Sequence, residues 1–318
     1  MKEFADCPFC GRHLKDKYSG LNDRLETTSR TFSVSECTGC RAGVLNPAPT
    51  GDLSSLYPTN YLSSEDSRSL VRKRFDLEKW YRYNQYKYDF SLLRRATGLR
   101  IGDATSYLDL GCGSGERVTF AAEDGCRRAV GVDKFDFAKS KAKDGAELIN
   151  AEILDYKPEE RFQVASLFHV LEHLDKPAEA LEHIRDEILA PAGDLIIQVP
   201  NYGSLESRLC RGRWFGLDVP RHFWDFNAQA LERLLERSGY RVNATYQLNA
   251  PLHPVTIVPS LFSGLDIQRI WVDRRHGEPY KKAMIALWAG LTVATIPLAL
   301  LQNLLNRSSM LTVVAARR

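Results

Sequence analysis

Short apolar runs alternate with amphipathic stretches between residues 105 and 248, a pattern typical of repeated strand–helix units. The runs expected to form strands are 106–110, 128–132, 146–150, 162–168 and 194–199. Two later apolar runs, 241–247 and 310–315, are expected to be closing strands. Five strand–helix units followed by two closing strands predict an open, mostly parallel α/β sheet.

The clearest helices follow Pro177 and Asn227. Proline is favoured in the first turn of a helix, and the apolar side chains after it recur on one face: Leu181, Ile184 and Ile188. Asn227 is a good N-cap, and Gly239 provides a stop after Leu231, Leu234 and Leu235. Both segments are therefore predicted to be helices that bury one face.

Composition limits the class of protein. The chain has 318 residues, 44% of them hydrophobic and 26% charged, with a formal net charge of +3. These values exclude fibrous and globally disordered chains, and they argue against a chain-wide nucleic-acid coat. The N-terminus has no apolar run, so we expect no secretory signal. Seven cysteines, an odd number, favour a reducing compartment, and we expect a cytoplasmic protein.

The strongest chemical signal is a glycine loop after the first strand, YLDLGCGSG at residues 107–115. Alternating glycines let the backbone turn tightly and let a ligand approach the main chain. A dinucleotide fingerprint would have a third glycine at position 116, which is Glu116 here, and no Walker lysine follows. Asp109 would repel a pyrophosphate, and it suits a ligand that carries an ammonium and a sulfonium.

Acidic residues follow the next two strands. Asp133 ends the second strand, where a carboxylate can accept both hydroxyls of an adenosine ribose. Glu152 and Asp155 follow the third strand, and either could accept the adenine amino group. The ends of these strands are neighbours in a doubly wound sheet, so the sequence predicts a nucleoside site there.

Four motifs in order resemble the class I S-adenosylmethionine-dependent methyltransferases: LDLGCGSG, GVD, the 162–174 segment ending VLEHL, and the 192–201 segment ending QVPN. The resemblance covers residues 100–250 and implies a Rossmann-like, doubly wound, seven-stranded sheet that binds S-adenosylmethionine. It implies cofactor contacts at Asp109, Gly111, Cys112, Gly113, Gly115, Asp133 and Phe168, with Glu152 or Asp155 at the adenine. Gln163 departs from the family's usual Asp, and Glu152 stands where an Asp is usual.

Transfer to an alcohol or an enolisable carbon also needs a base, and histidine titrates in the right range. His222 lies in the aromatic segment PRHFWDF, residues 220–226, and His173 lies in the VLEHL motif. We expect His222 or His173 to be the base, with His169 a weaker candidate. Each could instead make only structural hydrogen bonds.

Two CxxC pairs, Cys7/Cys10 and Cys37/Cys40, are separated by 26 residues. Four thiolates at this spacing predict a closed, structural zinc site, with Gly11 and Gly39 expected to supply the tight turns. Residues 1–50, the expected zinc ribbon, carry 7 basic and 6 acidic residues. This near-zero net charge argues against an interface dominated by contacts to phosphates. The ribbon's place before the core resembles bacterial sugar and glycan-cluster methyltransferases.

Two segments outside the core remain. Residues 68–100 carry 10 basic and 3 acidic residues among many aromatics, and we expect a helix that caps the sheet or meets an anionic surface or substrate. Residues 283–306 form an uncharged segment, and this segment is long enough to span a bilayer. Pairing of the two closing strands would return both ends to one side, so a re-entrant or in-plane helical hairpin is expected, with a buried dimer contact or helical cap as the alternative.

The sequence thus predicts five segments: a zinc ribbon (1–50), a helical linker or cap (51–100), a cofactor-binding core (101–250), a hydrophobic helical insertion (251–306) and a closing strand (307–318). The expected function is methyl transfer from S-adenosylmethionine to a sugar or lipid-linked glycan at the inner face of the cell membrane, which residues 251–306 would contact. The alternatives are a zinc-ribbon RNA methyltransferase, although nucleic acid is the less favoured partner, and a non-catalytic membrane adaptor on the same scaffold.

Overall fold

The structure is a computed structural model of the 318-residue chain, and it describes all residues except 52–53, 58–76, 136–144, 249–255 and 273–275. The chain forms two compact units. The ribbon unit contains Met1–Leu62, Pro200–Arg233 and Gln247–Leu311, and the sheet unit contains Ser63–Val199, Leu234–Tyr246 and Thr312–Arg318. Each unit joins segments far apart in the sequence, whereas the five segments above follow composition along the chain and remain a prediction.

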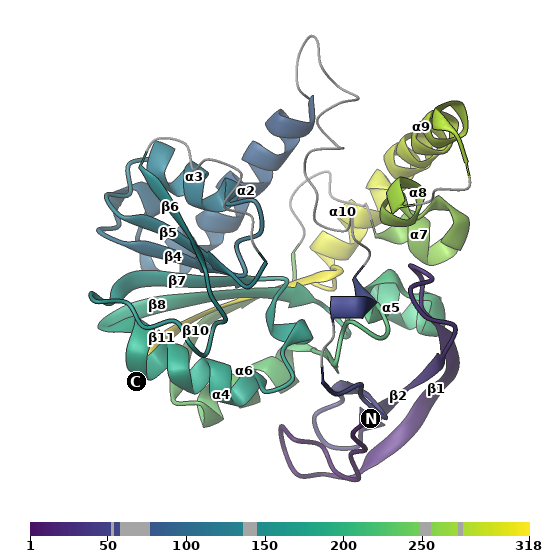
Figure 1. The fold of residues 1–318 in the computed structure, drawn as a ribbon, viewed down its shortest axis with the longest axis horizontal. Helices are drawn as coiled ribbons and strands as arrows, with labels where there is room; N and C mark the ends of the chain where they lie inside the picture. Colours follow the sequence, from purple (N-terminus) through teal and green to yellow (C-terminus); the bar gives the residue numbers. More distant parts are fainter. Residues whose placement is uncertain (52–53, 58–76, 136–144, 249–255, 273–275) are drawn as a thin grey trace. The chain divides into compact units, whose positions relative to one another are not determined.

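The sheet unit is built on a seven-stranded sheet in the order β10-β11-β8-β7-β4-β5-β6 (Figure 1). Its strands are β4 (Tyr107–Leu110), β5 (Ala129–Asp133), β6 (Ala146–Asn150), β7 (Phe162–Phe168), β8 (Leu189–Pro200), β10 (Tyr240–Tyr246) and β11 (Met310–Arg317). β4 pairs in parallel with β5 and β7, and β10 and β11 are antiparallel. All seven strands predicted from apolar runs are confirmed, so the mostly parallel α/β sheet is confirmed too.

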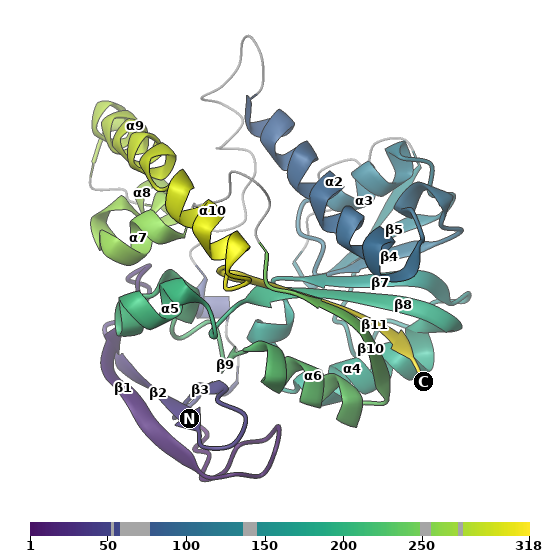
Figure 2. The ribbon, with the colours of Figure 1, turned by 180° about the vertical axis from the view of Figure 1, so that it is seen from behind.

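Helices cover both faces of this sheet. α2 (Leu77–Thr97) and α3 (Glu116–Glu123) lie on one face, and α4 (Pro177–His183) lies on the other (Figures 1 and 2). Phe90 of α2 and Phe120 of α3 stack with centroids 5.7 Å apart, and Phe90 also meets Tyr107 of β4 edge-on. The aromatic side chains of residues 86–90 are therefore partly core, as the capping-helix interpretation expected, although residues 68–76 lie outside the described part.

Three short helical turns complete the unit: η2 (Ile101–Asp103), η3 (Leu171–His173) and the π-helical η4 (Ile184–Ile188). The helix after Pro177 is confirmed, with Leu181, Ile184 and Ile188 buried. Among the connections that the structure describes in full, the one from β6 to β7 lacks a helix, and its residues 151–161 form a turn only. This segment is mainly polar and contains Pro158, so it offers no apolar stripe for a helix to bury.

The ribbon unit carries a four-stranded antiparallel sheet in the order β1-β2-β3-β9. Its strands are β1 (Leu14–Asn22), β2 (Thr31–Cys37), β3 (Gly43–Leu45) and β9 (Trp224–Asp225). The last strand comes from the aromatic segment 220–226, which is not among the seven strands expected from apolar runs. Phe9 and Phe4 meet the Trp224 ring with centroids 5.2 and 5.4 Å apart. This part of the aromatic segment therefore completes the ribbon.

In the part of the ribbon unit that the structure describes, the helices are short apart from α9. They are η1 (Ser54–Leu56), α5 (Leu205–Cys210), η5 (Arg211–Arg213), η6 (Phe215–Leu217), α7 (Ile257–Leu261), η7 (Ser263–Leu265), α8 (Ile267–Val272), α9 (Glu278–Ala294) and α10 (Ile296–Leu304). α6 (Ala228–Arg237) runs from the ribbon unit's segment into the sheet unit's, and Asn227 caps it through the Ala230 N–H at 3.0 Å. No single described helix is long and apolar enough to cross a membrane, but α9 and α10, bent by 42°, meet that criterion as a pair.

Candidate cofactor site and zinc centre

The glycine loop lies between β4 and α3 at the edge where the strand order of the sheet reverses. Ligands of doubly wound sheets bind at this switch point, beyond the carboxyl ends of the strands. Gly111, Gly113 and Gly115 all have left-handed backbones, with φ of 75°, 53° and 73°. Only glycine adopts this conformation without a steric penalty. The loop therefore needs its three alternating glycines for local reasons alone.

The three glycines differ in the space that surrounds them. A Cβ added at Gly111 would lie 2.4 Å from Cγ2 of Val170, and one at Gly115 would lie 2.6 Å from Cδ2 of Leu148. A Cβ at Gly113 would meet nothing within 4 Å. The outer glycines are thus required by packing inside the protein, while the middle glycine borders open space that a ligand can enter.

Asp109 is almost completely buried beneath this loop. The Ser166 hydroxyl donates to its Oδ1 at 2.6 Å, and the Ser166 and Tyr107 hydroxyl oxygens are 2.7 Å apart. Burial raises the pKa of Asp109 to about 6, partly offset by the Arg117 guanidinium. An ionised Asp109 would stabilise a cationic ligand more than a neutral or anionic one.

Asp133 connects the end of β5 to the glycine loop. Its Oδ2 accepts the Gly113 N–H and its Oδ1 accepts the Phe135 N–H, each at 2.9 Å. Burial raises the pKa of Asp133, and these two hydrogen bonds lower it. A carboxylate offers about four acceptor positions, so two remain for ribose hydroxyls. The predicted ribose contact therefore fits the geometry.

The sequence analysis missed an ion pair between the partly buried Arg117 of α3 and the buried Asp89 of α2. The Arg117 side chain lies with its guanidinium carbon 4.0 Å from the Phe168 ring centroid, and its Nη2 is 3.3 Å from Oδ2 of Asp89. Gln198 donates to the other Asp89 oxygen at 3.1 Å. The partners lie on α2, α3 and β8, so no local motif could indicate them. Phe168, a predicted cofactor contact, packs here against Arg117.

The other predicted cofactor residues have no contact that assigns their role. Glu152 and Asp155 are exposed and share one turn, in which the Asp155 N–H donates to the Glu152 carbonyl at 3.1 Å. Cys112 is half-buried, and its N–H donates to the Val132 carbonyl at 3.2 Å. The adenine contact remains a prediction for both acids.

The candidate bases fall in different units. In the sheet unit, His173 ends η3 with its N–H donated to the Val170 carbonyl at 3.0 Å. His169 follows β7 with a left-handed φ of 58°, and its Nδ1 is 3.5 Å from Oε1 of Glu172. The strained backbone at His169 is typical of functional turns, but it assigns no role by itself.

In the ribbon unit, His222 is buried and its Nδ1 lies 2.7 Å from the Gly216 carbonyl oxygen. A carbonyl can only accept, so Nδ1 carries the proton and the lone pair of the neutral ring is on Nε2. Nε2 lies 3.9 Å from Oδ2 of Asp218. This arrangement fixes the tautomer in the way that a general base requires.

A buried ion network holds the His222 segment in place. Arg221 is 1% exposed, and its guanidinium contacts Asp218 at 2.6 Å and Asp23 at 2.8 Å. Arg24 contacts Asp218 at 2.7 Å and also pairs with Asp266. The two guanidinium groups hold the pKa of Asp218 far below its usual range despite its burial. The network thus joins the ribbon, the His222 segment and α8.

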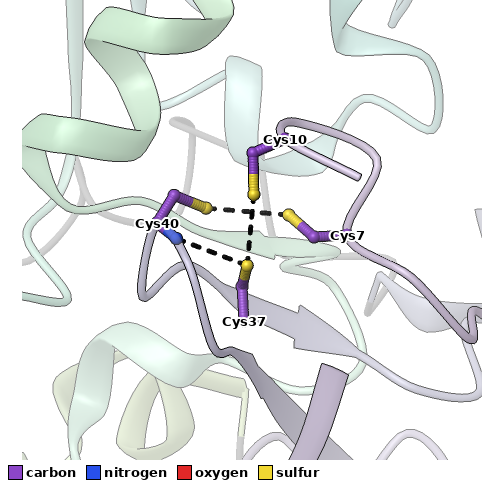
Figure 3. Close-up of side chains that lie close together, drawn as sticks. All are labelled: Cys7, Cys10, Cys37 and Cys40. Atoms are coloured by element: carbon purple, nitrogen blue, oxygen red, sulfur yellow. Dashed lines mark hydrogen bonds between the residues drawn. The ribbon is translucent and has the colours of Figure 1, made fainter. Parts of the chain in front are cut away.

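The four paired cysteines converge in the ribbon unit (Figure 3). The Sγ atoms of Cys7 and Cys40 are 3.6 Å apart, those of Cys10 and Cys37 are 3.3 Å apart, and all four lie within 4.8 Å of one another. Thiolates about 2.3 Å from a tetrahedral zinc would be separated by roughly 3.8 Å, so the donor set fits this ion. The predicted cluster is confirmed, and its metal remains a prediction.

One detail of the cluster differs from expectation. Gly11 has the expected left-handed backbone, with φ of 70°. In the second pair, however, the left-handed residue is Arg41, with φ of 61°, and not Gly39. Gly11 and Arg41 each follow the second cysteine of a pair, and each donates its N–H to the carbonyl of the first cysteine. At Gly39 the constraint is space, because a Cβ there would lie 2.7 Å from Cγ of Arg12.

A comparison with protein-family models agrees with this fold. A methyltransferase-domain family model matches residues 80–245, more than half of the chain. No curated protein matches. Similar solved structures include an S-adenosylmethionine-dependent methyltransferase from Mesorhizobium loti, with 17% identity, 72% of this chain and 97% of that chain covered, and a TM-score of 0.45. Another, from Archaeoglobus fulgidus, has 19% identity, coverage of 73% and 94%, and a TM-score of 0.45.

A third similar structure is the 1,6-didemethyltoxoflavin-N1-methyltransferase of Burkholderia thailandensis with bound S-adenosylhomocysteine, at 14% identity, 95% and 99% coverage and a TM-score of 0.45. The family match includes the glycine loop, Asp133 and the strands that carry them. The chain therefore belongs to the class I S-adenosylmethionine-dependent methyltransferases.

Proposed function

We propose that this enzyme methylates a small-molecule acceptor of the sugar or lipid-linked glycan class, with His222 as the general base and a structural zinc in its ribbon. The observation that carries the cofactor part is the open space at Gly113, whose N–H donates to Asp133, in the loop that follows the buried Asp109. Bound S-adenosylmethionine would supply an electrophilic methyl group on a sulfonium. The protein's own task is then to hold the cofactor, align the acceptor and remove its proton.

The residues that would hold the cofactor have different tasks. Asp109 supplies negative charge beneath the loop, and Asp133 supplies two unused acceptor positions for the ribose hydroxyls. The outer glycines keep the loop in shape, and Gly113 leaves the approach open. Glu152 or Asp155 would accept the adenine amino group.

Support for a sugar-type acceptor comes from what the base can do. The Gly216 carbonyl accepts from Nδ1 of His222, so the neutral ring carries its lone pair on Nε2, the form that can remove a proton from a hydroxyl or from an enolisable carbon. The near-neutral ribbon, with 7 basic and 6 acidic residues over positions 1–50, disfavours an RNA acceptor. Sugars and glycans present hydroxyls from which such a base can remove a proton.

Calorimetry with S-adenosylhomocysteine tests the cofactor assignment. We expect Asp133→Ala to weaken binding at least about 100-fold, because it removes two hydrogen bonds to a charged group, which contribute about 1.5–3 kcal/mol each. Glu159→Ala, at an exposed acid, is the matched control and should bind normally. Wild-type affinity in the Asp133 variant would refute the ribose assignment.

A panel of lipid-linked and nucleotide-linked sugars, read by mass spectrometry for one added methyl group, tests the acceptor class. With an active acceptor, His222→Ala should lower kcat by about 100- to 10,000-fold while leaving S-adenosylhomocysteine affinity unchanged. An unchanged kcat would exclude His222 as the base and leave His173 to be tested in the same way. Methylation of RNA but of no sugar would overturn the acceptor class.

A further inference from the structure

The two helices α9 and α10 expose an unusual amount of apolar surface. Residues 283–306 carry no charge, yet no residue of α9 is buried in the described part of the chain. Only Ala299 and Gln302 are buried in α10. A helix that is apolar on all sides is normally buried in a large core or in a membrane.

Large side chains account for this exposure. Leu304 is 83% exposed, Val293 64% and Leu300 52%, and Leu287, Leu301 and Leu305 are each about half exposed. The neighbouring α7 ends at Leu261, which is 46% exposed, and Phe262 follows it, 51% exposed. α7, α8 and α9 lie together in the ribbon unit (Figure 1). Such a concentration on one group of helices marks an interaction surface, because single exposed leucines are normally scattered.

The ends of this segment limit how it can meet a membrane. The Ser308 N–H donates to the Gln247 carbonyl at 3.2 Å, and the Asn201 amide donates to both Gln247 Oε1, at 3.0 Å, and the Ser308 carbonyl, at 2.8 Å. The chain therefore leaves and re-enters the fold at one place. Together with the 42° bend between α9 and α10, this excludes a single crossing and requires both ends to stay on the same side.

Charge indicates the kind of surface. Positions 279–318 contain no Asp or Glu. Lys281 and Lys282 stand at the start of α9, and Arg307 follows the end of α10, so cations flank the apolar stretch at both ends. Cations at the edge of an apolar helical face match anionic lipid headgroups. A second copy paired through the same helices would bring Lys281, Lys282 and Arg307 of both copies together, and Glu278 is the one acidic residue of α9 and α10.

We propose that α9 and α10 dock the protein in the plane of an anionic lipid surface, with their leucines in the acyl boundary and Lys281, Lys282 and Arg307 at the headgroups. The bend lets both helices lie along the interface, and the shared entry point keeps the rest of the ribbon unit on the aqueous side. The docking requires no acceptor and no methyl transfer, so its test is independent of the proposed function.

Vesicle flotation of the full-length, zinc-loaded protein tests the proposal. We expect the protein to float with vesicles of phosphatidylcholine plus phosphatidylglycerol, and less with phosphatidylcholine alone. The double variant Leu300→Glu and Leu304→Glu should lower the bound fraction at least about tenfold. Leu209→Glu is the matched control, because Leu209 is an equally exposed leucine (65%) on α5 of the same unit. Lys281→Glu with Lys282→Glu should remove only the preference for anionic vesicles.

Circular dichroism and S-adenosylhomocysteine affinity establish that each variant is folded. Absence of flotation by the folded wild-type protein overturns the proposal. Light scattering then identifies the alternative, because a stable dimer that Leu300→Glu and Leu304→Glu dissociates would make this surface a self-association face. Equal loss of flotation in the Leu209 control would also overturn the assignment to α9 and α10.

Discussion

Replacing Gly113 with alanine separates a cofactor role from a folding role. Its φ of 53° makes any Cβ unfavourable, and left-handed backbone costs a non-glycine residue about 1–2 kcal/mol. Alanine recovers about 0.4–1 kcal/mol by restricting the unfolded chain. Because a Cβ at Gly113 meets nothing within 4 Å, no clash adds to this cost. We therefore expect a net loss of about 1 kcal/mol in the free energy of unfolding.

Gly98 provides a matched control in the same unit. It has φ of 81° at the end of α2, and a Cβ there also meets nothing within 4 Å. Gly98→Ala should therefore cost a similar free energy of unfolding. Only the Gly113 methyl group occupies the space that the cofactor must enter. If this methyl group costs the cofactor one charge-assisted contact, worth about 1.5–3 kcal/mol, binding should weaken about 10- to 150-fold.

Urea denaturation measures the stability of both variants, and calorimetry with S-adenosylhomocysteine measures binding. The expected pattern is equal destabilisation with weakened binding in Gly113→Ala alone. Wild-type affinity in Gly113→Ala would refute the assignment of this space to the cofactor. Equal weakening in Gly98→Ala would show that binding reports general destabilisation.

Three further predictions concern the zinc, the buried ion network and Asp109. Cys37→Ser should abolish bound zinc, measured by mass spectrometry of the metal, and should speed proteolysis of residues 1–50 while S-adenosylhomocysteine still binds the sheet unit. Arg221→Met should cost about 3–5 kcal/mol in urea denaturation, because it leaves Asp23 and Asp218 buried beside fewer cations, whereas Arg208→Met at an exposed site should cost little. Asp109 has a folded-state pKa of about 6, above its ordinary value of 3.8, so the folded state binds more protons and stability falls as pH rises from about 4 to 6. The free energy of unfolding of Asp109→Asn should therefore rise relative to that of the wild-type protein, by up to about 3 kcal/mol between pH 4 and 6.

Each of these has an outcome that contradicts it. Retention of zinc by Cys37→Ser would show that the cluster is not the metal site. Equal stability of the two arginine variants would mean that the Arg221 network contributes no net stability. If the free energies of unfolding of Asp109→Asn and the wild-type protein differed by a constant amount from pH 4 to 6, the Asp109 carboxyl would have an ordinary pKa in the folded protein.

The elements that could be predicted from the sequence are those in which neighbouring residues decide the outcome. Apolar runs located all seven strands of the large sheet. The signal is strongest for strands such as β4, β5 and β7, because a strand that is buried on both faces is apolar throughout. Pro177, Asn227 and Gly239 marked helix ends because their preferences are local. The same holds for the glycine loop and the CxxC pairs, whose spacing is set within a few residues.

The sequence could not show contacts between distant segments. Asp89 and Arg117 lie 28 positions apart, and Asp23 and Arg221 lie 198 apart, so no pattern along the chain links them. The strand β9 at Trp224 also depended on a partner elsewhere in the fold, because it pairs with β3. His222 was identified as a candidate from its motif, but the Gly216 carbonyl that fixes its tautomer was not.

The sequence alone determined the class of fold, the glycine bend and the four thiolates, because local backbone preferences and short-range spacing encode them. Only the tertiary structure decided which glycine faces open space, how the buried arginines are paired and which apolar helices stay uncovered. These properties depend on what lies within a few ångströms in space, and such neighbours come from segments that the sequence places far apart.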